Sequence, residues 1–127
     1  MEISRAVLVV ACAISAGIHG ALVREHFVEG IGPGLGFLVA TVLLFGLAAA
    51  LVIQPSERWV VASATVMAGL IVSYVLAVTT GLPILHPDVE PVDGLALFTK
   101  SVEALGLLVT FDLLGRTGLH LHERTTK

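Results

Sequence analysis

The stretch SAGIHGALVREHFVE, residues 15–29, places a histidine inside an apolar segment and then ends in a polar cluster. Residues 6–23 are otherwise apolar apart from Ser15, and Arg5 and Arg24 bracket them. A helix that rises 1.5 Å per residue crosses the hydrocarbon core of a membrane, about 30 Å thick, in about 20 residues. The stretch therefore predicts a membrane-spanning helix with one histidine in its interior. A removable signal sequence fits less well, because its apolar part usually runs for about 7–15 residues and only residues 6–11 precede Cys12.

The composition of the whole chain also indicates lipid as the solvent. Of its 127 residues, 56% are hydrophobic and 13% are charged, and the mean hydropathy is +0.97. Soluble domains carry about 25% charged residues, and a small domain has a large surface to cover with them. A net charge of −3 gives no basic face for nucleic acid, and a single cysteine excludes a disulfide framework or a paired-thiol metal site.

Three further charge-poor segments complete the predicted fold. With the first segment, they predict membrane spans at about residues 5–24, 31–53, 59–80 and 95–115. A polar, frayed tail is predicted at residues 116–127 and contains His120 and His122. The predicted fold class is an all-α membrane protein, an antiparallel four-helix transmembrane bundle with short loops that forms one domain over residues 1–127. Lysine and arginine outside the spans favour cytoplasmic termini in a multi-pass protein of the cell membrane. One side holds Arg5, Arg58, Arg116, Arg124 and Lys127, and the other holds only Arg24.

Ionisable groups inside the spans need partners, because charges in a bilayer cost several kcal/mol. In antiparallel first and last helices, Arg5 and Asp112 lie at one level, which predicts a structural ion pair. Glu103 lies at the level of His19, which predicts a second cross-helix pair. Lys100 precedes Glu103 by three residues and is the alternative partner for that carboxylate.

Histidines and carboxylates are the candidate metal or cofactor ligands. Imidazole and carboxylate together suit zinc, copper or iron, so copper, zinc and haem are the candidate cofactors. His19 and His26 are seven residues apart, about 10 Å on a straight helix, so they cannot share one metal ion or haem. Metal binding at the outer surface therefore predicts that His26 and His86 approach within about 5 Å. The candidate ligands are His19, Glu103, His26, His86 and Glu90.

Small residues recur every four positions in the third segment, at Gly69, Ser73, Ala77 and Gly81. Such a ridge lets helix backbones approach closely in lipid, where dispersion holds helices together. The predicted ridge packs against another helix of this chain or against a second copy.

Two stretches together resemble small four-helix membrane proteins of actinobacteria. They are GIHGALVREHFVEG at residues 17–30 and TTGLPILHPDVEPVDG at residues 79–94. The resemblance implies a bacterial cytoplasmic membrane and brings no activity with it.

Three functions are consistent with these patterns, and no motif indicates a catalysed reaction. The first is an integral membrane protein with a His/carboxylate cluster near the extracytoplasmic face that binds a metal or redox cofactor. The second is an accessory or assembly subunit of a larger membrane complex, which predicts a ridge that faces lipid. The third is a small proton-coupled transporter that acts as an oligomer, which predicts a hydrated cavity reaching Glu103. The expected partners are the lipid bilayer and a second copy or a larger membrane complex, and not nucleic acid.

Overall fold

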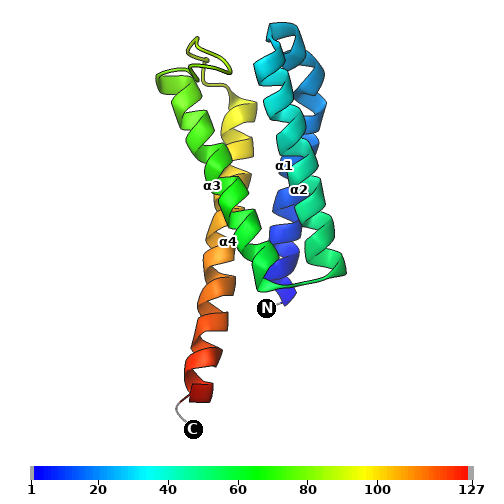
Figure 1. The fold of residues 1–127 in the computed structure, drawn as a ribbon, viewed down its shortest axis with the longest axis vertical. Coiled ribbons are helices and arrows are strands. Elements are labelled where there is room, and N and C mark those ends of the chain that lie inside the picture. The colour runs from blue at the N-terminus through cyan, green and yellow to red at the C-terminus, as the bar shows by residue number, and fades with distance from the viewer. Residues whose placement is uncertain (1, 126–127) are drawn as a thin grey trace.

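The chain folds into four antiparallel α-helices, seen here in a computed structural model (Figure 1). The structure describes the backbone of residues 2–125 and the side chains of residues 2–116. The helices are α1 (Glu2–Glu29), α2 (Ile31–Ile53), α3 (Glu57–Thr79) and α4 (Gly94–Thr125). All four contain a stretch long and apolar enough to cross a membrane. The predicted fold class, an all-α membrane bundle, is confirmed.

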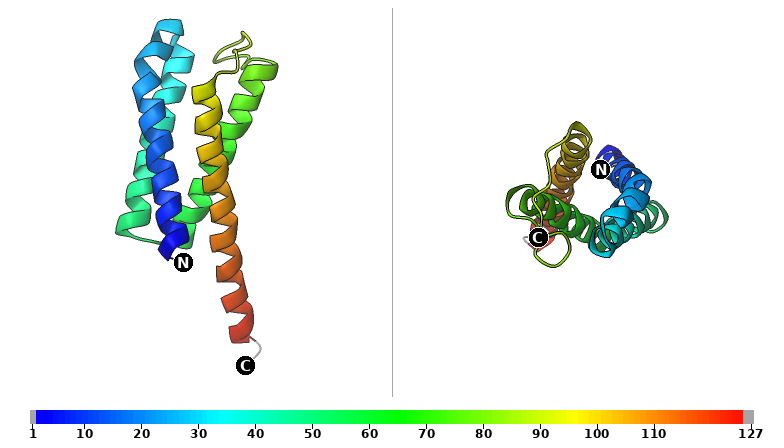
Figure 2. Two further views of the ribbon diagram at one scale, coloured as in Figure 1. Left: turned by 180° about the vertical axis from the view of Figure 1, so that it is seen from behind. Right: turned by 90° about the horizontal axis from the view of Figure 1, so that it is seen from above.

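The bundle consists of two hairpins, α1–α2 and α3–α4, which pack side by side (Figure 2). We call the end that holds Gly30 and the loop of residues 80–93 the upper end, at the top of Figure 1. The N-terminus and the α2–α3 link lie at the opposite, lower end, and α4 extends beyond the other helices there. Helix α1 contacts α2 and α4, and α3 also contacts both α2 and α4.

Helices α1 and α4 are both longer than predicted. Residues 2–29 contain no proline, and α1 runs through Gly20 without a break to Glu29. His19 and His26 therefore stay in different layers of the bundle, as a straight helix requires. The predicted frayed tail is instead helical as far as Thr125, because residues 116–125 also lack proline and an existing helix adds residues easily. The side chains of His120 and His122 lie outside the described residues.

The apolar core fills the lower half and the middle of the bundle. Leu8, Ala11, Cys12 and Ala16 recur at helical spacing and share one buried face of α1. They pack against the other core residues Leu44, Leu47, Ala48, Leu51, Val60, Met67 and Leu113. Gly106 permits the close approach of α4, since a Cβ there would meet the sulfur of Met67 and the methyl group of Ala11.

The predicted small-residue ridge does not form one continuous contact within the described chain. A Cβ on Gly69 would meet nothing within 4 Å, Ser73 is exposed, and Ala77 is buried. Gly81 lies beyond the end of α3, in a turn. A spacing of four residues rotates by about 40° at each step on a helix, so these positions drift away from any one neighbour. Contact of the ridge with a second copy stays a prediction.

The loop of residues 80–93 folds back over the upper end. Gly81 starts it with a φ of 74°, in the left-handed region that favours glycine. Leu82 and His86 then exchange two backbone hydrogen bonds of 2.7 and 2.8 Å, and the amide of Glu90 donates to the carbonyl of Ala77 at 3.0 Å. A Cβ on Gly32 would lie 2.5 Å from the carbonyl oxygen of Leu85, so the loop also rests on α2. The loop is thus held at both hairpins.

Candidate metal centre

A cavity of about 590 Å³ opens at the upper end, between the two hairpins and against the folded-back loop. All four helices and the loop contribute to its lining. Its charged lining residues are the carboxylates Glu25, Glu29, Glu90 and Asp93 and the single cation Lys100, joined by the histidines His19, His26 and His86. Asp93 also caps α4, because its Oδ1 accepts from the amide of Ala96 at 2.7 Å. The excess of carboxylates makes this cavity attractive to cations.

His26 is held in one orientation by contacts on two sides. Its ring stacks on Phe37 of α2, with 3.6 Å between the ring centroids, and 12% of the side chain is exposed. Its Nδ1 lies 3.0 Å from the carbonyl oxygen of Leu22. Since a carbonyl can only accept, Nδ1 carries the proton and Nε2 keeps its lone pair in the neutral ring. This arrangement is the usual one for a metal-binding histidine, whose other nitrogen donates to a backbone carbonyl or carboxylate.

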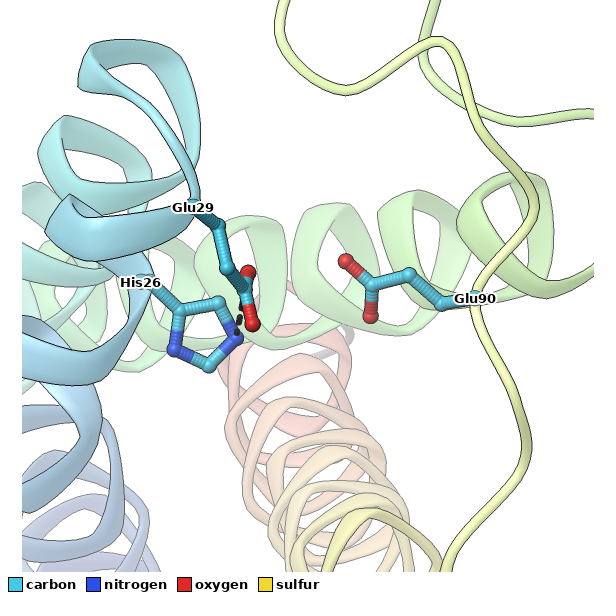
Figure 3. Close-up of side chains that lie close together, drawn as sticks. All are labelled: His26, Glu29 and Glu90. Atoms are coloured by element: carbon cyan, nitrogen blue, oxygen red, sulfur yellow. Dashed lines mark ion pairs between the residues drawn. The ribbon is translucent and has the colours of Figure 1, made fainter.

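Two carboxylates face the Nε2 atom of His26 (Figure 3). Glu29 lies one turn further along α1, and its Oε2 is 3.9 Å from Nε2. Glu90 comes from the loop and points at both residues from across the cavity (Figure 3). One ligand atom from each of the three residues lies within 4.8 Å of the other two. Ligands of a tetrahedral ion with bonds near 2 Å are about 3.3 Å apart, so small side-chain movements would complete such a site.

His86 lies in the same cavity but does not belong to this group. Its Nδ1 donates to the carbonyl oxygen of Asp88 at 3.0 Å and is 3.8 Å from the carboxylate of Glu90. The imidazole that converges with Glu29 and Glu90 is that of His26. The predicted approach of His26 and His86 stays a prediction. The His86 ring is instead bonded within its own loop, through the Asp88 carbonyl.

Glu29 is not among the predicted ligands, although the sequence contains a signal for it. Residues 26–29 read HFVE, and side chains three residues apart on a helix lie on the same face. Carboxylate-histidine pairs at this spacing supply metal ligands in other helical bundles. The signal is weak because Glu29 stands among several charges at the end of the apolar segment.

At the lower end of the cavity, His19 lies close to Glu103, as the antiparallel arrangement of α1 and α4 predicted. Nε2 of His19 is 4.0 Å from Oε1 of Glu103, and the carboxylate is fully buried. Its nearer partners are the hydroxyl of Ser15, which donates to Oε1 at 2.7 Å, and Lys100, whose Nζ is 2.6 Å from Oε2. Nδ1 of His19 donates to the Ser15 carbonyl at 2.9 Å. The predicted alternative partner, Lys100, therefore neutralises Glu103, and a ligand role for His19 and Glu103 stays a prediction.

The predicted ion pair between Arg5 and Asp112 is wrong. Arg5 pairs with Glu2 at 2.6 Å, and Asp112 pairs with Arg116 at 2.9 Å, in each case with a neighbour on its own helix. Partners one helical turn away are always within reach at an exposed helix end, whereas a cross-helix pair also requires the right rotation of both helices. Ser4 replaces Arg5 as the link between the terminal helices, since its hydroxyl donates to Asp112 at 3.0 Å.

Together the fold and these groups define a class, a four-helix membrane protein with a polar cavity at one end of the bundle. Comparisons of the chain with models of known protein families, with curated proteins and with solved structures found no match. We therefore infer its function from the geometry of the cavity.

Proposed function

We propose that this membrane protein binds a divalent transition-metal ion through Nε2 of His26 and the carboxylates of Glu29 and Glu90. The observation that carries the proposal is the convergence of these three ligand atoms within 4.8 Å, from two separate parts of the chain. The distribution of lysine and arginine in the sequence supports an extracytoplasmic position for this end of the bundle, within a bacterial cell membrane.

Two of the three ligands are positioned before any ion arrives, the His26 ring by its side-chain contacts and Glu90 by its backbone. Phe37 and the Leu22 carbonyl fix the His26 ring, with Nε2 left as the ligand atom. The backbone hydrogen bond from Glu90 to Ala77 anchors the loop residue to the end of α3. Prior organisation of this kind raises affinity, because less conformational freedom is lost when the ion binds.

The donor set favours zinc and similar divalent ions. One imidazole and two carboxylates are borderline and hard donors, which suit zinc, manganese and iron(II), whereas copper(I) prefers thiolate or thioether sulfur. Haem already fills four iron positions with its own nitrogens, so two carboxylates beside one imidazole suit a bare ion better. Three protein ligands also leave a fourth position to water, as in open zinc sites.

Isothermal titration calorimetry of the purified protein in detergent with Zn²⁺ tests this proposal. We expect one ion per chain, and an optical spectrum of the Co²⁺ form with the intensity of a four- or five-coordinate site. Glu90→Gln removes a charged ligand while keeping the size of the side chain, and is expected to weaken Zn²⁺ binding at least tenfold. Asp88→Asn is the matched control, because Asp88 is an exposed carboxylate in the same loop. Its affinity is expected to stay within about twofold of the native value.

Absence of saturable Zn²⁺ binding by the native protein would contradict the proposal. Equal losses in Glu90→Gln and Asp88→Asn would also contradict it, because they would indicate general attraction of cations by an acidic loop.

A further inference from the structure

The hydroxyl of Tyr74 is a buried polar group that lacks a hydrogen-bond partner among the described residues. Tyr74 lies on α3 and lines the cavity at the upper end. Buried polar groups in folded proteins nearly always have a partner, because removing such a group from water without one is costly. The hydroxyl oxygen itself has almost no accessible surface, so a ligand in the cavity that Tyr74 lines reaches it once the side chain moves slightly.

Lys100 offers a second donor to the same space. Its Nζ donates to the Glu103 carboxylate at 2.6 Å and to the Leu70 carbonyl at 3.4 Å, and an ammonium group has three hydrogens. Lys100 also lines the cavity, with its Nζ 5.8 Å from the centroid of the Tyr74 ring. Two donors on the cavity wall, one of them uncharged, suit a ligand that accepts hydrogen bonds.

The cavity is much larger than an ion needs. Its volume of about 590 Å³ falls in the range of pockets that hold small organic molecules, about 300–1,000 Å³. His19 lies ten residues below Glu29 on α1, so the cavity reaches about 15 Å down that helix. Apolar side chains make up much of its wall, among them Ile18, Leu22, Phe37, Leu70, Ala77 and Leu95.

The charges beside the cavity floor select among ligand classes. Lys100 disfavours an organic cation at this depth, since like charges repel. Glu103 already neutralises Lys100 and would itself repel a ligand carboxylate. A neutral carbonyl oxygen is repelled by neither charge, because it accepts hydrogen bonds without adding a charge to the apolar interior.

We propose that this cavity binds a neutral, lipid-soluble molecule with a carbonyl-bearing headgroup. The carbonyl oxygen accepts hydrogen bonds from the Tyr74 hydroxyl and the Lys100 ammonium group, and the apolar body lies along α1 and α2. This binding site is additional to the metal site and does not depend on it.

Equilibrium dialysis of the purified protein with a benzoquinone that carries one short prenyl chain tests the inference. The protein is first treated with a chelator, so that a metal contributes nothing to the result. Saturable binding of one probe molecule per chain is expected. Tyr74→Phe removes only the hydroxyl oxygen and is expected to weaken binding about tenfold, while Zn²⁺ affinity stays unchanged.

A second pair of variants tests the position of the ligand without touching its hydrogen bonds. Ser73→Phe places a ring in the cavity from an exposed position on α3 and is expected to abolish binding. Val72→Phe places the same ring at the neighbouring exposed position, which does not line the cavity, and is expected to bind like the native protein.

Three results would overturn the inference: no saturable binding by the native protein, native affinity in Tyr74→Phe, or equal losses in Ser73→Phe and Val72→Phe. Binding in detergent that disappears in phospholipid nanodiscs would overturn it too, because membrane lipid would then occupy the cavity. Zn²⁺ titrations of the same proteins report separately on the metal site.

Discussion

Ser15 on α1 and Glu103 on α4 are joined by a hydrogen bond of 2.7 Å between two fully buried side chains. The hydroxyl donates to one carboxylate oxygen, and Lys100 occupies the other. Hydrogen bonds to a charged group are stronger than those between neutral groups. This contact therefore fixes how the first and last helices face each other within the apolar part of the bundle.

Removal of the Ser15 hydroxyl should destabilise the bundle. Ser15→Ala leaves one lone pair of a buried carboxylate without its donor, and we expect a loss of about 1–3 kcal/mol in the free energy of unfolding. Ser101→Ala is the matched control, since Ser101 is exposed on α4 and bonds only to the carbonyl of Leu97. The control should change the free energy by less than about 0.5 kcal/mol. Unfolding of both variants in mixed detergent micelles measures the difference, and equal effects would contradict the prediction.

The ion pair between Lys100 and Glu103 predicts that substitutions of these two residues have non-additive effects on the free energy of unfolding. Lys100→Met leaves the buried carboxylate without its cation, and breaking a buried pair in this way costs about 3–5 kcal/mol. Adding Glu103→Met removes the stranded charge, so the double variant should be more stable than Lys100→Met alone. The same unfolding assay decides the matter. Additive losses from the two substitutions would show that the groups do not depend on each other.

The sequence was sufficient to predict the four helices and the depth of the groups inside them. Charge-free segments mark the spans, and counting 1.5 Å per residue in antiparallel helices places His19 beside Glu103. The same counting placed Arg5 beside Asp112, where the structure gives each a partner on its own helix. Depth follows from residue number, but the rotation of each helix depends on packing across the whole bundle. Buried groups have few alternative partners, whereas exposed ones find a neighbour one turn away.

The proposed metal site and the proposed ligand cavity depend on tertiary contacts that no local pattern contains. Glu90 reaches His26 only because Gly81 turns the loop and Ala77 receives its amide. The Tyr74 hydroxyl lacks a hydrogen-bond partner because no polar group of the described residues lies within reach of it. Only the packed structure shows this. Glu29 is different, because its spacing from His26 was visible in the sequence.

Phe37 should position His26 for metal binding. Its ring stacks on the imidazole, so Phe37→Leu frees the histidine to rotate, and we expect Zn²⁺ affinity to fall about three- to tenfold. Phe45→Leu, at an exposed position on the same helix, should leave the affinity unchanged. Calorimetric titration gives the affinities, and thermal unfolding without metal shows whether either variant merely loosens the bundle. A fall in stability with native Zn²⁺ affinity would contradict the positioning role.

Gly81 should be required for the loop but not for the bundle. Alanine in the left-handed region costs about 1–2 kcal/mol, and its Cβ would also collide with the carbonyl oxygen of Pro87. We expect Gly81→Ala to release the loop, which speeds hydrogen exchange at the amides of Leu82 and Glu90. Zn²⁺ affinity should fall with it, because Glu90 would no longer be held beside His26.

Gly69 provides the matched control for the same substitution on the same segment of chain. It lies within α3, and a Cβ there would meet nothing within 4 Å. Alanine is a better helix former than glycine by about 1 kcal/mol, so Gly69→Ala should stabilise α3 and leave both loop exchange and Zn²⁺ affinity unchanged. If Gly81→Ala exchanged its loop amides at the native rate, the turn would not be what holds Glu90. The loop would then have to be held by its contact with Gly32 on α2.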